Sequence, residues 1–550
     1  MLTMHKYLSL PLLLLLPWSN PAGAVPLFVR DEPWTGNQTS LGNSTLAGNE
    51  TLTGTETFKS NETTTPEVLV RDYNTLNATT WNGQEVPRFL LGGNVRTVGQ
   101  YANGTTYVIE TPSRNNNTGN TTLTSGTGRL IPFPPPRLLA SANSTRTNRT
   151  QLPADADELS KAAANGVLTL SIVNKWPSEN LLVYVSGLDT KGALVMLGQD
   201  GKWMNPTTSS ATPEPVKGSI AIPLGKPNST LTLTLPGYIE SSRVWIVDGK
   251  LDFFVVATPN GPGLVEPAAV NAADPNSQRN YAFAELSWAA AYGLYADITA
   301  VDFVGLPLGI ELEEANNAKR SILGTPSNAA DHLCDVLKTQ ASKDKQPWDQ
   351  LCYRDSKNKL VRVLAPSNLI SQKPDAFKGY YDRYVENAWT KYANEDLIIE
   401  TQTDAGKVPC RVKDNLLQCK GDNRPYAKPT ASDIMGCNTG PFGIQSGDNG
   451  VHLAVVPRLC AAFHRSTLFL KGGNVQPGLS PKDYYRTPKS GPNSNNPPKN
   501  YYSKFVHEIE HEGRGYAFAY DDVTLKGEWD QSGLVASPQP RLLRIIVGGT

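Results

Sequence analysis

Two acidic residues in the middle of the chain, Glu285 and Asp302, are the best candidates for paired acid/base chemistry. They belong to residues 283–309, FAELSWAAAYGLYADITAVDFVGLPLG, where Glu285 and Ser287 alternate with apolar residues as on a β-strand. A second run follows a short turn, and its polar residues are Tyr295, Asp297, Thr299 and, after a change of phase, Asp302. In an antiparallel hairpin the carboxylates of the two runs can stand across a groove from each other. Two carboxylates flanking a sugar bond are what glycoside hydrolysis requires, although the same spacing also fits two solvated strand residues.

A second motif, HEIEH at residues 507–511, competes with this pair. It matches H-E-x-x-H, in which two histidines one helical turn apart bind zinc and the glutamate acts as a base. The ligands would be His507 and His511, the base Glu508, and a third ligand Glu528 or Asp530. Against a zinc site, glycines at 513 and 515 end any helix at once, and residues 516–523 alternate as a strand. The sequence therefore favours a loop or strand here over a metallopeptidase.

Charge balance and the chain ends limit the classes of function. The chain has 550 residues, and 51 Lys and Arg balance 51 Asp and Glu, which argues against nucleic acid or an anionic membrane as a partner. An apolar run at residues 8–18 followed by Ala-Gly-Ala predicts a signal peptide that ends at residue 24. The run is too short to span a bilayer, and the C-terminus lacks a lipid-anchor signal. The mature protein is expected to be secreted and soluble, either extracellular or associated with a cell wall.

Residues 25–155 differ in composition from the rest of the chain. They are rich in Asn, Thr, Ser and Gly, lack cysteine, and carry many N-x-S/T sequons, which are expected glycan sites in a secreted chain. Such a polar segment cannot bury enough apolar surface to offset its chain entropy, so we expect a disordered, glycosylated extension. A small hairpin within residues 88–109 is the alternative, because Leu and Val alternate there.

From residue 166 onward, short segments of period two are separated by Gly, Asp and Pro turns, which indicates an antiparallel sandwich or barrel. Helical spacing appears at residues 328–340 and 374–393, and a helix with proline in its first turn is expected at 457–466. The second of these helices has an aromatic stripe that fits a buried core better than a sugar platform: Phe377, Tyr381, Tyr384 and Trp389.

All cysteines fall in this later, mixed region. An even count in an oxidising compartment predicts disulfides, and no CxxC pair points to structural zinc. Of fifteen possible connectivities, we expect sequential pairing: Cys334 with Cys352, Cys410 with Cys419, and Cys437 with Cys460. The expected division of the chain is a signal peptide at 1–24, an extension at 25–155, a β-domain at 156–312, a mixed α/β domain at 313–470, and a segment at 471–550 that returns to the β-domain.

Several motifs together resemble one known family. They occur in this order: ELS at 285–287, YADIT at 295–299, VDFVGLP at 301–307, PRLCAAFHRSTL at 457–468 and GRGYAFAYDDV at 513–523. The chain is similar in these motifs to glycoside hydrolase family 64, the thaumatin-like β-1,3-glucanases, of a fungal type. The resemblance covers residues 166–549 and leaves the N-terminal extension outside.

The resemblance implies a fold that is mainly β with α+β: a thaumatin-like antiparallel β-sandwich or barrel plus a mixed α/β domain, with a wide groove between them for a β-1,3-glucan chain. It implies an inverting mechanism with Glu285 as general acid and Asp302 as general base. Ser287, Tyr295 and Thr299 match positions that touch sugar. Asp297 stands where the family more often has Asn, and an added carboxylate there can raise neighbouring pKa values or compete as the base.

The physical chemistry of the pair agrees with these roles. The apolar neighbours Phe283, Leu286 and Trp288 favour a raised pKa and the acid role for Glu285. Proton transfer between carboxylates and water requires no metal or cofactor. The expected partner is a β-1,3-glucan polysaccharide, with no nucleic acid and no membrane, and the protein is expected to be a monomer. The alternative from another class is a glucan-binding wall protein without catalysis.

Overall fold

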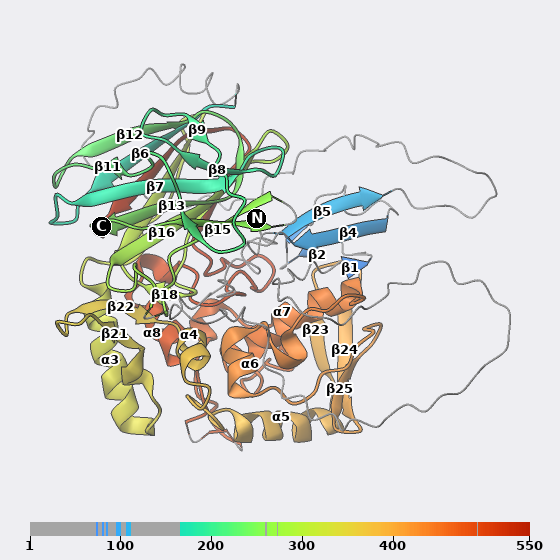
Figure 1. Cartoon of the computed structure of the whole chain (residues 1–550). Helices are drawn as coiled ribbons and strands as arrows, with labels where there is room; N and C mark the ends of the chain where they lie inside the picture. Colours follow the sequence, from blue (N-terminus) through green and yellow to red (C-terminus); the bar gives the residue numbers. More distant parts are fainter. Residues whose placement is uncertain are drawn as a thin grey trace, which may run out of the picture.

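The computed structural model describes residues 166–549, except 259–260, 272, 492 and 495, together with the backbone of short strands between residues 73 and 111 (Figure 1). The expected signal peptide and most of the expected extension lie outside the described residues. The short strands are β1 (Tyr73–Asn74), β2 (Thr80–Trp81), β3 (Gln84–Glu85), β4 (Val95–Gln100) and β5 (Thr106–Thr111). Strands β4 and β5 pair antiparallel and so form a hairpin. A hairpin within residues 88–109 was the alternative that the sequence analysis gave to disorder.

An eight-stranded sheet carries the candidate site. The strand order is β27-β17-β16-β13-β7-β8-β9, with β11 added on β7. The bounds are β7 (Leu181–Leu188), β8 (Leu194–Leu197), β9 (Trp203–Met204), β11 (Ile222–Pro223), β13 (Ile239–Asp248), β16 (Asn280–Ala289), β17 (Gly293–Ile298) and β27 (Leu534–Ser537). All the pairs are antiparallel, so the expected hairpin of β16 and β17 is confirmed.

A five-stranded sheet packs against it, in the order β12-β6-β28-β19-β20. The bounds are β6 (Leu168–Asn174), β12 (Thr230–Leu235), β19 (Leu308–Glu314), β20 (Lys319–Ile322) and β28 (Pro540–Val547). Apolar residues of both sheets form one buried cluster, which includes Ile172, Val244, Leu286, Trp288 and Ile545. Since side chains alternate along a strand, the odd-numbered residues of β16 are left on the opposite face of the larger sheet.

The opposite face of the larger sheet is also covered. Its apolar side chains belong to a second buried cluster, which includes Trp245, Phe283, Phe303 and Leu364. Two small sheets contribute, β10-β14-β15 and β18-β22-β21. Their strands are β10 (Glu214–Pro215), β14 (Phe254–Thr258), β15 (Gly261–Val265), β18 (Phe303–Val304), β21 (Cys352–Arg354) and β22 (Leu360–Leu364).

The helices lie together on the side of the larger sheet where β18 and β22 are found (Figure 1). They are α3 (Ala329–Asp344), α4 (Pro366–Gln372), α5 (Asp382–Asn394), α6 (Ala431–Gly436), α7 (Gly450–His464) and α8 (Tyr501–Ile509). Short 3₁₀ turns occupy Trp348–Leu351, Gly440–Phe442, Pro481–Asp483 and His511–Gly513. A four-stranded sheet joins them, with β23 (Leu397–Glu400), β24 (Lys407–Lys413), β25 (Leu416–Cys419) and β26 (Val475–Gln476). No helix within the described ranges is long and apolar enough to cross a membrane.

Two of the expected helices begin at residues other than those predicted. The helix predicted from residue 374 begins at Asp382, because Phe377 and Gly379 have positive φ angles of 60° and 77° that an α-helix cannot contain. The helix predicted from residue 457 begins at Gly450, where the Asn449 side chain accepts a hydrogen bond from the amide of His452, so that its proline lies in the helix interior. The aromatic stripe Phe377, Tyr381, Tyr384 and Trp389 is buried, as expected of a core.

The disulfides have the sequential pairing expected from the sequence: Cys334–Cys352, Cys410–Cys419 and Cys437–Cys460. The first joins α3 to β21, the second joins paired strands β24 and β25, and the third joins the end of α6 to α7. Each therefore links neighbouring elements of the region between β20 and β27.

Candidate active site

Three charged side chains form a row across adjacent strands of the larger sheet. Arg243 on β13 stands opposite Glu285 on β16, and Glu285 stands opposite Asp297 on β17. Directly opposed residues project to the same face, so all three side chains point away from the core between the two sheets. Each is buried, with exposed fractions of 6%, 3% and 1%. Buried charges require partners, and within this row Arg243 is the partner of Glu285.

Glu285 is surrounded by its neighbours across the sheet and not by its neighbours in sequence. Leu286 and Trp288 belong to the core on the other face, so they do not surround the carboxylate as the sequence analysis assumed. Phe283 does share its face, where its ring lies 4.5 Å from Cζ of Arg243. Nε of Arg243 donates a hydrogen bond of 3.0 Å to Oε1 of Glu285. The environment is thus an ion pair beside aromatic rings.

The sequence analysis missed Arg243 and its second partner, Glu266. Nη1 of Arg243 forms a salt bridge with Oε2 of Glu266, the residue after β15. Burial lowers the pKa of Arg243, but the charges of Glu266, Glu285 and Asp302 outweigh it and raise that pKa above its ordinary value. One sequence signal could have identified Arg243. It is a single arginine next to the apolar run 244–247, and on a strand it shares a face with the aromatic residue at 245. No sequence signal identifies Glu266.

Asp302 lies in the loop between β17 and β18. Its side chain is partly exposed, unlike those of Glu285 and Asp297. Its backbone carbonyl accepts hydrogen bonds from the amide of Ala365 (2.8 Å) and from Nδ2 of Asn368 on α4 (2.7 Å). Its charge acts on Arg243, so it belongs to the same electrostatic site as Glu285. The helical region therefore holds the backbone of Asp302 beside the sheet.

The other predicted contact residues differ in accessibility. Ser287 is fully buried, and its hydroxyl accepts a 3.1 Å hydrogen bond from the amide of Ser241. Tyr295, opposite Ser287, is half-buried, and burial raises its pKa to about 12. Thr299 is also half-buried, and its hydroxyl accepts a 3.2 Å hydrogen bond from the amide of Val301. Of these three side chains, only Tyr295 and Thr299 have exposed surface to offer a ligand.

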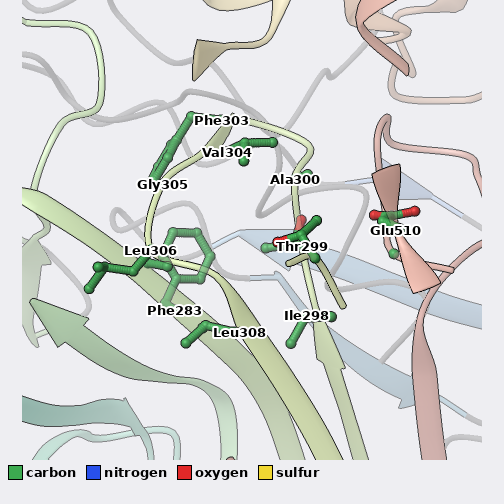
Figure 2. A pocket seen from close by; sticks show the side chains of 13 residues that line it. Phe283, Ile298, Thr299, Ala300, Phe303, Val304, Gly305, Leu306, Leu308 and Glu510 are labelled. Atoms are coloured by element: carbon green, nitrogen blue, oxygen red, sulfur yellow. The ribbon is translucent and has the colours of Figure 1, made fainter. Parts of the chain in front are cut away.

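A small cavity lies beside Thr299. Figure 2 shows it between Phe283, Thr299 and Leu306, with Glu510 reaching toward it from a separate segment. Its volume is about 40 Å³, which is enough for very few water molecules. Burial raises the pKa of Glu510 to about 7 despite its ion pair with His507. This pocket lies next to the charged row, and Thr299 is the predicted contact residue that lines it.

The geometry of the HEIEH segment does not favour zinc. Helix α8 ends at Ile509, so His511 falls in a 3₁₀ turn and is not one helical turn from His507. Nδ1 of His507 lies 2.9 Å from Oε2 of Glu510, and Nε2 lies 2.9 Å from Oδ2 of Asp521. Although burial lowers the pKa of His507, Asp521 and Glu510 raise it to about 10. A protonated ring with both nitrogens in ion pairs has no lone pair for a metal.

Residues 516–523, expected to alternate as a strand, form turns. Oδ2 of Asp521 accepts hydrogen bonds from the amides of Ala517 (2.8 Å) and Phe518 (3.3 Å), which curls the chain around the carboxylate. A single bridge connects Tyr516 to Thr299. Tertiary hydrogen bonds thus override the period-two pattern here.

The fold is one found among β-1,3-glucanases. A solved structure described as a laminaripentaose-producing beta-1,3-glucanase in complex with laminaritetraose matches with a TM-score of 0.60 and 23% identity, covering 70% of this chain and 98% of that chain. The beta-1,3-glucanase domain (GH64) from Clostridium beijerinckii matches with a TM-score of 0.51 and 21% identity over the same shares. At these identities the likeness concerns the fold.

Residues 166–547 match the family described as Beta-1,3-glucanase, so the chain belongs to glycoside hydrolase family 64, and the family expected from the sequence is confirmed. Two curated relatives, the glucan endo-1,3-beta-glucosidases of Cellulosimicrobium cellulans and of Arthrobacter sp. (strain YCWD3), are each 25% identical over 301 residues. Those matches cover 54% of this chain and 50% of each relative. The chain therefore spans about half the length of the curated relatives it matches.

Proposed function

We propose that this protein is a secreted endo-acting hydrolase that cleaves β-1,3-glucan, with Glu285 as general acid and Asp302 as general base. The observation that carries the proposal is the charged row on one sheet face, Arg243, Glu285 and Asp297, with the carboxylate of Asp302 in the adjoining loop. Family membership and relatives named for this activity support the choice of substrate.

The two carboxylates divide the reaction between them. Glu285 gives its proton to the glycosidic oxygen as the bond from that oxygen to the anomeric carbon breaks. Asp302 accepts a proton from a water that attacks the anomeric carbon from the opposite face, so the product has inverted configuration. A buried acid and a partly exposed base suit this division, because the base must bind water.

Asp302 is preferred to Asp297 as the base for reasons of space. Side chains directly opposed on antiparallel strands have Cβ atoms about 4.5–5.5 Å apart. An inverting pair needs its carboxyl groups about 6.5–9.5 Å apart, to leave room for the water. Asp297 is directly opposite Glu285 and almost fully buried, whereas Asp302 lies beyond the strand end. The glucan chain would lie in a groove between this sheet face and the helical region, as in a thaumatin-like architecture.

The test uses conservative variants on a soluble β-1,3-glucan. We expect Glu285→Gln and Asp302→Asn each to lower turnover by at least about 100-fold while leaving the melting temperature unchanged, because only the proton-transfer groups change. Asp297→Asn is the matched control and should keep activity within about tenfold. Wild-type turnover in either of the first two variants, or loss in Asp297→Asn alone, contradicts the assignment.

Product configuration provides a separate test. Inversion of a β-linkage yields the α-anomer first, which NMR detects before mutarotation. Initial β-anomer would instead indicate a retaining mechanism, for which the close pair Glu285 and Asp297 has the appropriate spacing.

Two other functions predict different results for the same protein. Binding to insoluble glucan without release of reducing ends would identify a non-catalytic wall protein. A metallopeptidase would instead cleave a peptide substrate, lose that activity on chelation and regain it with zinc, an outcome that the ion pairs of His507 oppose.

A further inference from the structure

The contact between Arg243 and Glu285 raises a physical difficulty for the proposed acid. A general acid must carry a proton, but a guanidinium at hydrogen-bonding distance favours the ionised carboxylate. The Nε–Oε1 distance is 3.0 Å, and both side chains are buried, so water screens this interaction weakly. Something else at the site must offset the positive charge if Glu285 is to hold a proton.

Glu266 is in the right place to do so. It contacts Nη1 of Arg243, while Glu285 contacts Nε, so one guanidinium serves two carboxylates through different donors. The ionised trio would carry a net negative charge in a largely dry environment, and taking up one proton makes it neutral. Burial and the nearby charge of Glu285 raise the pKa of Glu266 although Arg243 opposes them, as expected for two carboxylates that compete for one cation.

We propose that Glu266 is a positioning residue that shares Arg243 with Glu285 and thereby keeps Glu285 able to hold the proton it donates. This inference rests on the proposed function. Glu266 anchors Nη1 and so holds the plane of the guanidinium, while Nε donates to Glu285. Its negative charge also opposes the loss of the proton from Glu285.

The remaining acidic groups around Glu285 and Arg243 come from two other segments. Asp297 faces it from β17, and Asp302 acts on Arg243 from the loop after β17. Both are acidic and favour the protonated form of Glu285. A second cation, Arg362 on β22, lies 4.5 Å from the ring of Tyr281. Arg243 contacts Glu285 directly, so it is the cation whose effect must be offset. Tyr281, which shares the face of Glu285 on β16, stays neutral because burial raises its pKa.

The experiment compares pH profiles of kcat/KM on a soluble β-1,3-glucan. The alkaline limb reports loss of the proton from the acid. In Glu266→Gln the hydrogen bond to Arg243 can remain but the charge is gone, so this limb should move to lower pH by about 1 unit. In Arg243→Gln the cation is gone, so the limb should move to higher pH, alongside any loss of rate.

The control variant is Glu314→Gln in the other sheet. Glu314 is also a largely buried carboxylate paired with an arginine, with Nε of Arg320 at 2.5 Å from its Oε1. Its substitution should leave the alkaline limb in place. A purely structural role for Glu266 would lower the rate equally at every pH. The proposal is overturned if the alkaline limb stays in place in Glu266→Gln. It is also overturned if this limb shifts in the same direction in Glu266→Gln and Arg243→Gln, the two site variants.

Failure of this inference is distinguishable from failure of the proposed function. If Glu285→Gln keeps wild-type turnover, Glu285 is not the acid and the proposed function fails. If Glu285→Gln is inactive but the alkaline limb stays in place in both site variants, the acid stands and only the role of Glu266 is overturned.

Discussion

At the scale of single residues, the turn between β16 and β17 depends on one glycine. Gly293 has a φ of 78°, and a Cβ built on it would lie 2.2 Å from the carbonyl oxygen of Ser537 and 2.5 Å from Cα of Pro538. The close approach of β27 to this turn is what excludes a side chain. The position of Glu285 and Asp297 opposite each other depends on this turn, because it sets the hairpin register.

Gly293→Ala should therefore cost about 2–4 kcal/mol of unfolding free energy, the sum of a positive φ and a backbone clash. Gly201→Ala is the matched control, since Gly201 has a φ of 74° but no atom within 4 Å of its added Cβ. That control should cost only about 1–2 kcal/mol. Urea denaturation of both variants measures the difference, and equal losses would show that contact with β27 is unimportant.

At the scale of elements, helix α8 is held by a buried histidine. His507 bridges Glu510 and Asp521, and Asp521 also accepts a hydrogen bond of 3.1 Å from Arg465. The resulting chain of charges connects α8 to the turns at 516–523 and to the residue that follows α7. A motif that looks catalytic in the sequence is thus part of the packing of three segments.

This bridge makes stability depend on pH. The pKa of His507 is about 10 in the folded protein, above the ordinary value of 6.5. Its contribution is therefore fully present below about pH 6.5 and is lost as pH rises through about 10. We expect His507→Gln to lose about 3 kcal/mol at pH 7, because two buried carboxylates lose a cation.

The measurement is the melting temperature of wild type and variant from pH 6 to pH 10. The difference between the two should shrink as pH rises, because wild type loses its bridge while the variant has none to lose. A difference that is constant over this range would mean that His507 is neutral in the folded protein.

At the scale of the whole molecule, both ends of the described chain build one sheet. Strand β28 lies between β6, to which it is parallel, and β19, to which it is antiparallel. It contributes Leu543, Ile545 and Val547 to the core between the sheets. The helices and small strands of residues 323–533 are inserted between β20 and β27. Each of the two large sheets is therefore completed by a strand that follows this region in the sequence.

Truncations test this organisation. A chain that starts at residue 156 keeps the whole family match and both large sheets, so it should retain glucan hydrolysis and melt within a few degrees of the full chain. A chain that ends at residue 533 lacks β27 and β28 and should fail to give a cooperative melting transition. Hydrolysis by the second chain, or its absence in the first, would contradict the proposed division into domains.

The sequence by itself determined the local features of this protein. The period-two alternation of residues 283–289 and the turn before residue 294 predicted the hairpin, because strand geometry places alternate residues on opposite faces. The even cysteine count and spacing favoured the disulfides that are present. Each of these features depends on residues close together in the chain, or on chemistry that the residue type alone dictates.

Only the tertiary structure decided the electrostatics of the site. Arg243 is 42 positions from Glu285 and 23 from Glu266, and no local pattern links them. Likewise Asn368 reaches the carbonyl of Asp302 from a helix 66 positions away. The register between β13 and β16 and the packing of β15 and α4 on the sheet bring these groups together. Because the charge state of a buried carboxylate depends on its neighbours in space, the role of Glu285 follows from the fold and not from Phe283, Leu286 and Trp288 alone.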